Sequence, residues 1–173
     1  FLQDFIRNKD RFSFPEKIGE GITLHRAIDT FTDAHPEIHE AKKIFSPLVR
    51  LYAGAFVDVS FDYFLANSIG DKALKAHSEK VYRVLRNHEE LLPPNLLRML
   101  DRMEKDNWLY NYRSDWGIEF SMKNVLNKAK YLNKNLAVFE VFLNNKPRLQ
   151  YHFDHFFPDL VAEVQKIDSG FRS

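Results

Sequence analysis

The sequence has 173 residues, a length that fits one domain with a single hydrophobic core. Its 25 Lys and Arg residues nearly balance its 24 Asp and Glu residues, so the formal net charge is +1. This balance argues against nucleic-acid binding, because phosphate backbones are bound by a concentrated cationic face. The lack of cysteine excludes disulfides and thiolate metal sites and fits a cytoplasmic protein. The longest apolar runs span only a few residues, so no membrane association is expected.

Few stretches alternate apolar with polar residues, and 16 Phe residues supply large areas for helix packing. We therefore expect an all-α fold of about eight helices, forming one domain over residues 1–173. A capping box at Ser13 and Glu16 predicts a helix that ends near Asp33. Helical patterns then follow at 36–46, where Ser46-Pro47 predicts a break or kink, and at 48–68, 71–88, 94–116, 119–131, 135–145 and 148–167.

Three polar residues of the first predicted helix, His25, Asp29 and Asp33, share the spacing of one helix face. An imidazole and two carboxylates in a row can hold a divalent cation, and carboxylate oxygens favour hard ions. The alternative is an exposed polar stripe in which Asp33 acts as a cap.

A second pair of acids, Asp58 and Asp62, is also spaced by four residues, in a helix that is apolar on nearly every side. At least one of these carboxylates is therefore expected at or near the core, where it needs a cation, hydrogen-bond donors or protonation. Asp4 lies among apolar residues as well. Three helices that each bring an acid to an aromatic interior indicate a metal site. The alternative is that a buried Arg pairs with these acids.

The remaining histidines carry weaker signals. His35 and His39 lie at a predicted helix start, where capping or solvent exposure is the expected role. His152 and His155 stand among C-terminal phenylalanines, where packing is the expected role.

The motif Gly21-Ile22-x-x-His25-Arg26-x-Ile28-Asp29-x-x-Thr32-Asp33-x-x-Pro36 resembles the acyl carrier protein phosphodiesterase family. The later motif Asp58-x-x-Phe61-Asp62-x-Phe64-Leu65 and the opening Phe1-Leu2-x-Asp4-Phe5 are also similar to that family. The resemblance covers nearly the whole chain and implies that about twenty residues normally precede Phe1. One departure is Tyr63, which stands where the family usually has His after the second acid.

The resemblance implies an HD-like helical fold and a metal-dependent hydrolase that removes 4′-phosphopantetheine from holo-acyl carrier protein. The implied cation is Mn²⁺, with Mg²⁺ or Fe²⁺ as alternatives. Its implied ligands are Asp4, His25, Asp29 and Asp58. Asp62, Arg26 and Asp33 would serve the chemistry, with Arg26 facing the phosphate.

Two other readings fit the same residues. The chain could be an HD-like phosphohydrolase that acts on a nucleotide or another small phosphodiester. It could also be a non-catalytic helical interaction module, whose buried acids pair with Arg50, Arg98 or Arg102. An acidic carrier protein would further need a basic patch, for which the candidates are Arg7, Lys9, Arg11, Arg26, Lys42 and Lys43.

Overall fold

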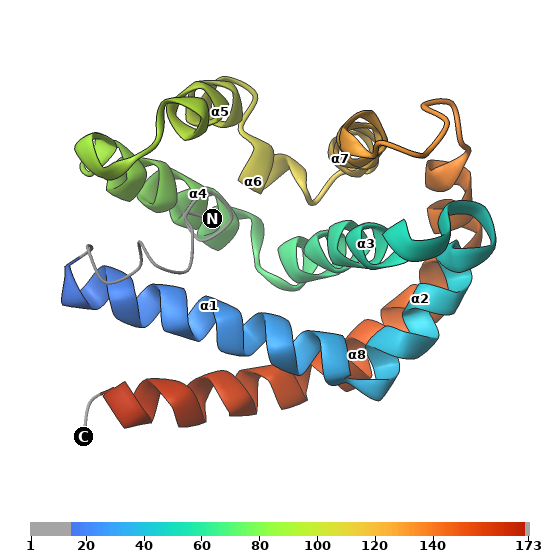
Figure 1. The fold of residues 1–173 in the computed structure, drawn as a ribbon, viewed down its shortest axis with the longest axis horizontal. Coiled ribbons are helices and arrows are strands. Elements are labelled where there is room, and N and C mark those ends of the chain that lie inside the picture. Colours follow the sequence, from blue (N-terminus) through green and yellow to red (C-terminus); the bar gives the residue numbers. More distant parts are fainter. Residues whose placement is uncertain (1–14, 172–173) are drawn as a thin grey trace.

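A computed structural model describes residues 15–171, and Figure 1 shows the path of the chain. Within that range the protein forms only helices and turns, which confirms the all-α fold class. The elements are α1 (Glu16–Ala34), α2 (Pro36–Val49), η3 (Arg50–Tyr52), α3 (Ala53–Ser68), α4 (Asp71–Arg86), η4 (Glu89–Leu91), α5 (Pro94–Lys105), α6 (Trp108–Asn111), α7 (Asp115–Lys128) and α8 (Val138–Phe171).

The main core lies where α2, α3 and α8 pack together, with α7 on a further side of α3. Phe45, Phe56 and Phe142 are fully buried in it, and the Phe45 and Phe56 ring centroids lie 5.8 Å apart. Burying a side chain of this size stabilises the fold by about 1.5–3 kcal/mol. The heavy aromatic content is therefore used as expected, in contacts between helices.

A smaller core joins α4, α5 and α6 above the main one in Figure 1. Leu96 and Leu100 of α5 are fully buried there, and the Tyr82 hydroxyl accepts a hydrogen bond from the Leu109 N–H. On the outside, Arg86 donates to Glu89, Asp101 and Glu104, which ties α4 to α5. This second cluster fixes α5 and α6 beside α3.

The first helices begin close to the predicted places. α1 starts at Glu16, but its cap is Pro15, so the capping box that placed the N-cap at Ser13 is wrong. α2 begins at Pro36, as predicted, and the His35 side chain caps it by accepting the Glu37 N–H at 3.2 Å. Histidine at this position therefore has the structural role that the sequence indicated.

Several predicted breaks fall elsewhere. α2 continues through Pro47 to Val49, and the turn comes at Arg50, whose φ of 51° directs the chain into η3 and then α3. Residues 94–116 are split into α5 and α6 at Asn107, which adopts a left-handed conformation. In contrast, 135–145 and 148–167 form one helix, α8, which contains Pro147 and Pro158.

The stretch Pro36–Ser68 is, by length and hydropathy alone, long and apolar enough to cross a membrane. The expectation that no stretch of the chain qualifies was therefore wrong. In the structure this stretch is two helices, α2 and α3, joined by η3, and side chains of both helices form the main core.

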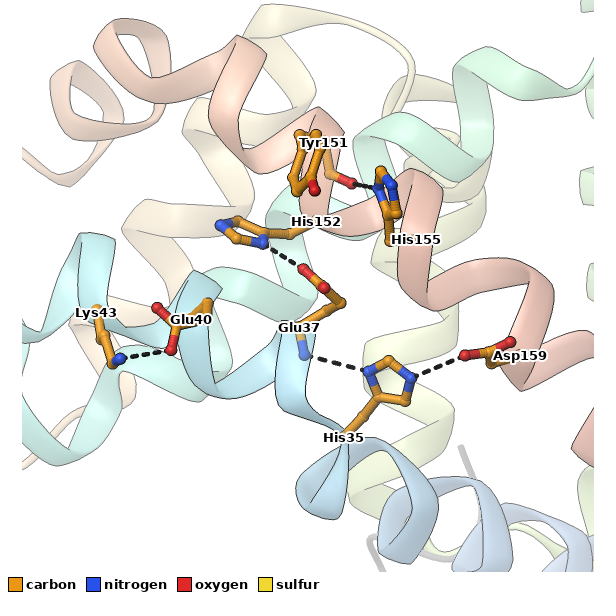
Figure 2. A network of polar contacts seen from close by, with 8 residues as sticks. All are labelled: His35, Glu37, Glu40, Lys43, Tyr151, His152, His155 and Asp159. Atoms are coloured by element: carbon orange, nitrogen blue, oxygen red, sulfur yellow. Dashed lines mark hydrogen bonds and ion pairs between the residues drawn. The ribbon is translucent and has the colours of Figure 1, made fainter.

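A polar network fastens α2 to α8, as Figure 2 shows. The buried His152 of α8 donates from Nδ1 to the Glu37 carboxylate at 2.6 Å. Because His35 accepts at Nδ1, its Nε2 carries the proton and donates to Asp159 of α8 at 3.3 Å. The predicted structural roles of these histidines are thereby confirmed, and the corner between α1 and α2 is held in place.

We expect Glu37→Ala to lower the free energy of unfolding by about 1–3 kcal/mol, because His152 would be left buried without its partner. Urea denaturation measures this change. Glu40→Ala, on the same helix but in an exposed pair with Lys43, is the control and should change stability little. Equal effects of the two substitutions would show that the buried pair does not stabilise the α2–α8 contact.

Candidate functional site

The polar row predicted on α1 is present. His25 and Asp29 lie one turn apart, and His25 Nδ1 is 3.0 Å from Asp29 Oδ2. Asp33 lies one further turn along, at the end of α1, and accepts a hydrogen bond from Lys42 of α2 at 2.9 Å. The row is therefore a continuous line of hydrogen-bonding groups that ends at the α1–α2 corner.

Asp58 of α3 faces the end of this row. Loss of hydration in the crowded space between the helices raises its pKa from 3.8 to about 6, against the opposing charge of Lys42. The negative charges of Asp33 and Asp29 raise its pKa further. The fold thus brings acids from two helices, distant in sequence, into one electrostatic group around Lys42.

A hollow of about 540 Å³ opens beside Asp58, so this carboxylate remains accessible to solvent although protein surrounds it. Gly54 makes room for Lys42 at its edge, since a Cβ on Gly54 would lie 3.2 Å from the lysine Cε. Arg50, with its strained positive φ, also lines the hollow; such strain costs on the order of 1–3 kcal/mol and tends to occur at functional sites.

Asp62 lies one turn beyond Asp58. Burial raises its pKa from 3.8 to about 7, and the nearby charge of Asp58 adds to the rise. Within residues 15–171 it accepts no hydrogen bond, and neither acid forms an ion pair with an arginine. The alternative of a buried Arg partner, with Arg50, Arg98 and Arg102 as candidates, is therefore wrong for the described part of the chain.

Arg26 adds a cation on α1, the residue after His25. Its Nη2 atom is shut off from solvent and has no hydrogen-bond partner among residues 15–171. A buried guanidinium N–H that lacks an acceptor is destabilising unless an anion or another acceptor reaches it.

A metal site is only partly visible in the described residues. The donor types fit a hard divalent cation, because α1 carries an imidazole and carboxylates and the charges of Asp29 and Asp33 act on Asp58 of α3. However, no three His, Asp or Glu side chains of residues 15–171 converge closely enough to hold an ion. The fourth predicted ligand, Asp4, lies outside the described residues.

Tyr63 is the position at which this chain departs from the family pattern, and its contacts show which way its side chain points. The Lys146 ammonium lies 4.1 Å from the centroid of its ring, and the ring packs edge-on against Phe142 of α8. The residue therefore points toward α8, away from the face of α3 that meets α1. Tyrosine at this position removes no donor from the Asp58–Asp62 face.

Sequence reasoning missed two contributions to the site. Lys42 was singled out only as a basic surface residue, yet it pairs with Asp33 and its charge acts on Asp58. Tyr112, which follows α6, was not considered as a site residue, yet its pKa is raised by burial and by the charge of Asp62. Neither is signalled by local spacing, because both reach the site through contacts between helices.

Taken together, two carboxylates of raised pKa on α3, the acids of the row on α1 and the Lys42 cation define a helical protein whose site is suited to acid–base chemistry. The sequence profile of the family described as acyl carrier protein phosphodiesterase matches residues 1–160. The chain therefore belongs to the acyl carrier protein phosphodiesterase family, and by that membership it is a hydrolase of the phosphodiesterase class.

Curated relatives agree with this membership. The acyl carrier protein phosphodiesterase of Salmonella agona (strain SL483) is 27% identical over 169 residues, which cover 95% of this chain and 88% of the relative. The protein of the same name from Enterobacter sp. (strain 638) is 24% identical over 168 residues, covering 95% and 87% of the two chains. No solved structure matches the chain.

The raised pKa of Asp62 predicts how stability depends on pH. Between pH 4 and pH 7 the folded state holds a proton on Asp62 that the unfolded chain has released, so folding is favoured at the acid end. This contribution is lost as the pH rises through about 7. In chelator, Asp62→Asn should therefore be more stable than the unsubstituted protein at pH 8, by on the order of 2–4 kcal/mol, and similar to it at pH 4.

Urea denaturation at both pH values measures this difference. Asp154→Asn, at an exposed position on α8, provides the control and should leave the pH dependence unchanged. A loss of stability at pH 8 in Asp62→Asn would mean that the carboxylate has a stabilising partner, and the argument from burial would fail.

Proposed function

We propose that this protein hydrolyses the phosphodiester that links 4′-phosphopantetheine to holo-acyl carrier protein and releases the apo-protein. Membership of the family and the names of its relatives support this substrate. The observation that carries the proposal is Asp62, an acid with a pKa of about 7 and no ion pair within residues 15–171, beside Asp58, on which the charges of the row on α1 act.

The reaction needs a nucleophilic water, neutralisation of charge at phosphorus and a proton for the leaving serine oxygen. A carboxyl whose pKa lies near 7 exchanges protons readily at neutral pH, so Asp62 can accept the proton of the attacking water and later return one. Arg26, whose Nη2 has no partner among residues 15–171, can donate to a phosphoryl oxygen. Asp33 holds Lys42 in place beside Asp58.

We further propose a divalent cation, Mn²⁺ first and Mg²⁺ or Fe²⁺ otherwise, with His25, Asp29, Asp58 and Asp4 as its ligands. When bound, such an ion lowers the pKa of a water and neutralises phosphoryl charge. Support comes from the repulsion among Asp29, Asp33 and Asp58, which a cation would relieve. Asp58 has no arginine partner among the described residues that could do the same.

The proposed reaction is tested by incubating the full-length protein with holo-acyl carrier protein and Mn²⁺ and weighing the carrier protein. Its mass should fall by the 4′-phosphopantetheine group. Asp62→Asn should lower turnover by ~100-fold or more, the scale for loss of a positioned acid–base group, while the protein stays folded. Asp154→Asn should match the unsubstituted protein. Normal turnover in Asp62→Asn would remove Asp62 from the mechanism.

Metal binding is tested without any substrate. Elemental analysis should find Mn²⁺, Mg²⁺ or Fe²⁺ in the purified protein, and Mn²⁺ at about 100 times its Kd should stabilise the folded state by about 2.7 kcal/mol. That corresponds to a rise in Tm of roughly 5–10 °C for a chain of this length. Asp29→Asn should reduce the rise. If chelator leaves Tm unchanged and no metal is found, the protein has no such site.

A further inference from the structure

A second cavity, of about 400 Å³, is lined by Tyr112, whose pKa is raised in part by the charge of Asp62. Its size is within the range of sites for small organic ligands. Elements α3, α5, α6 and α7 form its walls, with Val59, Met99, Trp108 and Val125 as the larger apolar surfaces. The remaining lining residues are Asn95, Arg98, Arg102, Tyr112, Ser121, Asn124 and Lys128.

The charged residues that line this pocket are all cations. Arg98 and Arg102 lie one turn apart on α5, Lys128 lies at the end of α7, and no Asp or Glu lines the pocket. None of the three cations forms an ion pair among residues 15–171, whereas Arg86 on neighbouring α4 contacts three carboxylates. Uncompensated positive charge around a concave apolar surface attracts anions.

The wall of the pocket also contains an unused donor. The indole Nε1 of Trp108 is buried and has no hydrogen-bond partner in the described part of the chain. A buried donor without an acceptor costs about 1–3 kcal/mol. Asn95 and Asn124 add side-chain amides, each able to donate and to accept.

Tyr112 connects this pocket to the candidate site. Its ring lines the pocket beside Ser121, and its phenol is close enough to Asp62 for the carboxylate charge to act on it. Val59 lines the pocket from α3, three residues before Asp62. The pocket therefore adjoins the Asp62 end of the Asp58–Asp62 face.

We propose that this pocket binds an organic phosphate that carries an apolar chain with amide groups. The cations would bind the phosphate, the apolar walls the chain, and the asparagine side chains its polar atoms. The identity of the ligand rests on the proposed function, under which it is the 4′-phosphopantetheine that hydrolysis releases.

Binding is measured by the fluorescence of Trp108 in the full-length protein. Trp116, which is 57% exposed and stacks on Phe120, is first changed to Phe so that Trp108 alone reports. Three probes are compared: 4′-phosphopantetheine, pantetheine without phosphate, and inorganic phosphate. We expect 4′-phosphopantetheine to bind at least tenfold more tightly than either of the others.

The double variant Arg98→Ala/Arg102→Ala should weaken the binding of 4′-phosphopantetheine at least tenfold and leave the binding of pantetheine nearly unchanged. The control, Lys72→Ala/Lys75→Ala, removes the same charge from exposed positions on α4 and should leave both unchanged. Both arginines are exposed, and a thermal melt verifies that the variants fold. Equal weakening in the two double variants would mean that only net charge acts, and would overturn the proposal.

Binding and hydrolysis are read separately. If holo-acyl carrier protein is hydrolysed but 4′-phosphopantetheine does not perturb Trp108, the pocket proposal fails and the proposed function stands. If 4′-phosphopantetheine binds at Trp108 without hydrolysis, the pocket stands and the proposed function fails. Equal affinity for inorganic phosphate and 4′-phosphopantetheine would show an anion site without a place for the chain, which also overturns the proposal.

Discussion

The site depends on one constraint, the burial of α3. This helix is packed by α2, α7 and α8, and its residues Phe56, Val57 and Phe64 are among the most buried in the protein. Side chains that carry charge must therefore use the side of α3 that these helices leave open, which faces α1. Asp58 and Asp62, one turn apart, share that side, where the surrounding protein partly desolvates their carboxylates. Their raised pKa values are thus a consequence of the core.

The spacing of residues along each helix was enough to predict which side chains of the site share a face. His25, Asp29 and Asp33 align because a helix repeats every 3.6 residues, and the aspartates of α3 stood out because nearly all their neighbours are apolar. The all-α class followed from the same periodicity. The positions of the turns did not, because Pro47 and Pro147 are tolerated inside helices whose flanking residues, Phe45, Val49 and Leu149, are held by the core. Arg50 and Asn107, where the chain does turn, carry no Gly or Pro signal.

The contacts that join segments distant in the chain could not be predicted from the sequence. Lys42 reaches Asp33 and acts on Asp58 only because the cap at His35 and the Glu37–His152 pair set the angle between α1 and α2 and hold α2 against α8 (Figure 2). The pocket at Trp108 needs α5 and α7 to stand on either side of α6, where the smaller core joins α5 to α6 and the Trp108 ring contacts Phe120 of α7. Residue types alone do not reveal such contacts, because no pattern within its own helix distinguishes any of these residues.

The two sides of the acid pair differ in charge, and this difference suits a substrate made of two unlike parts. On the Asp58 side lie the acids of α1 and the Asp33–Lys42 pair, bordered by an open hollow. On the Asp62 side, past Tyr112, lies a pocket with apolar walls and cations that no carboxylate balances among the described residues. A phosphodiester between a protein and a flexible arm would need an accessible approach for the protein and a recess for the arm. Asp62 stands at the boundary between the two, where burial and its neighbour Asp58 keep its pKa near neutrality. The same geometry that makes the carboxylate costly to ionise thus places it where the proposed reaction would move a proton.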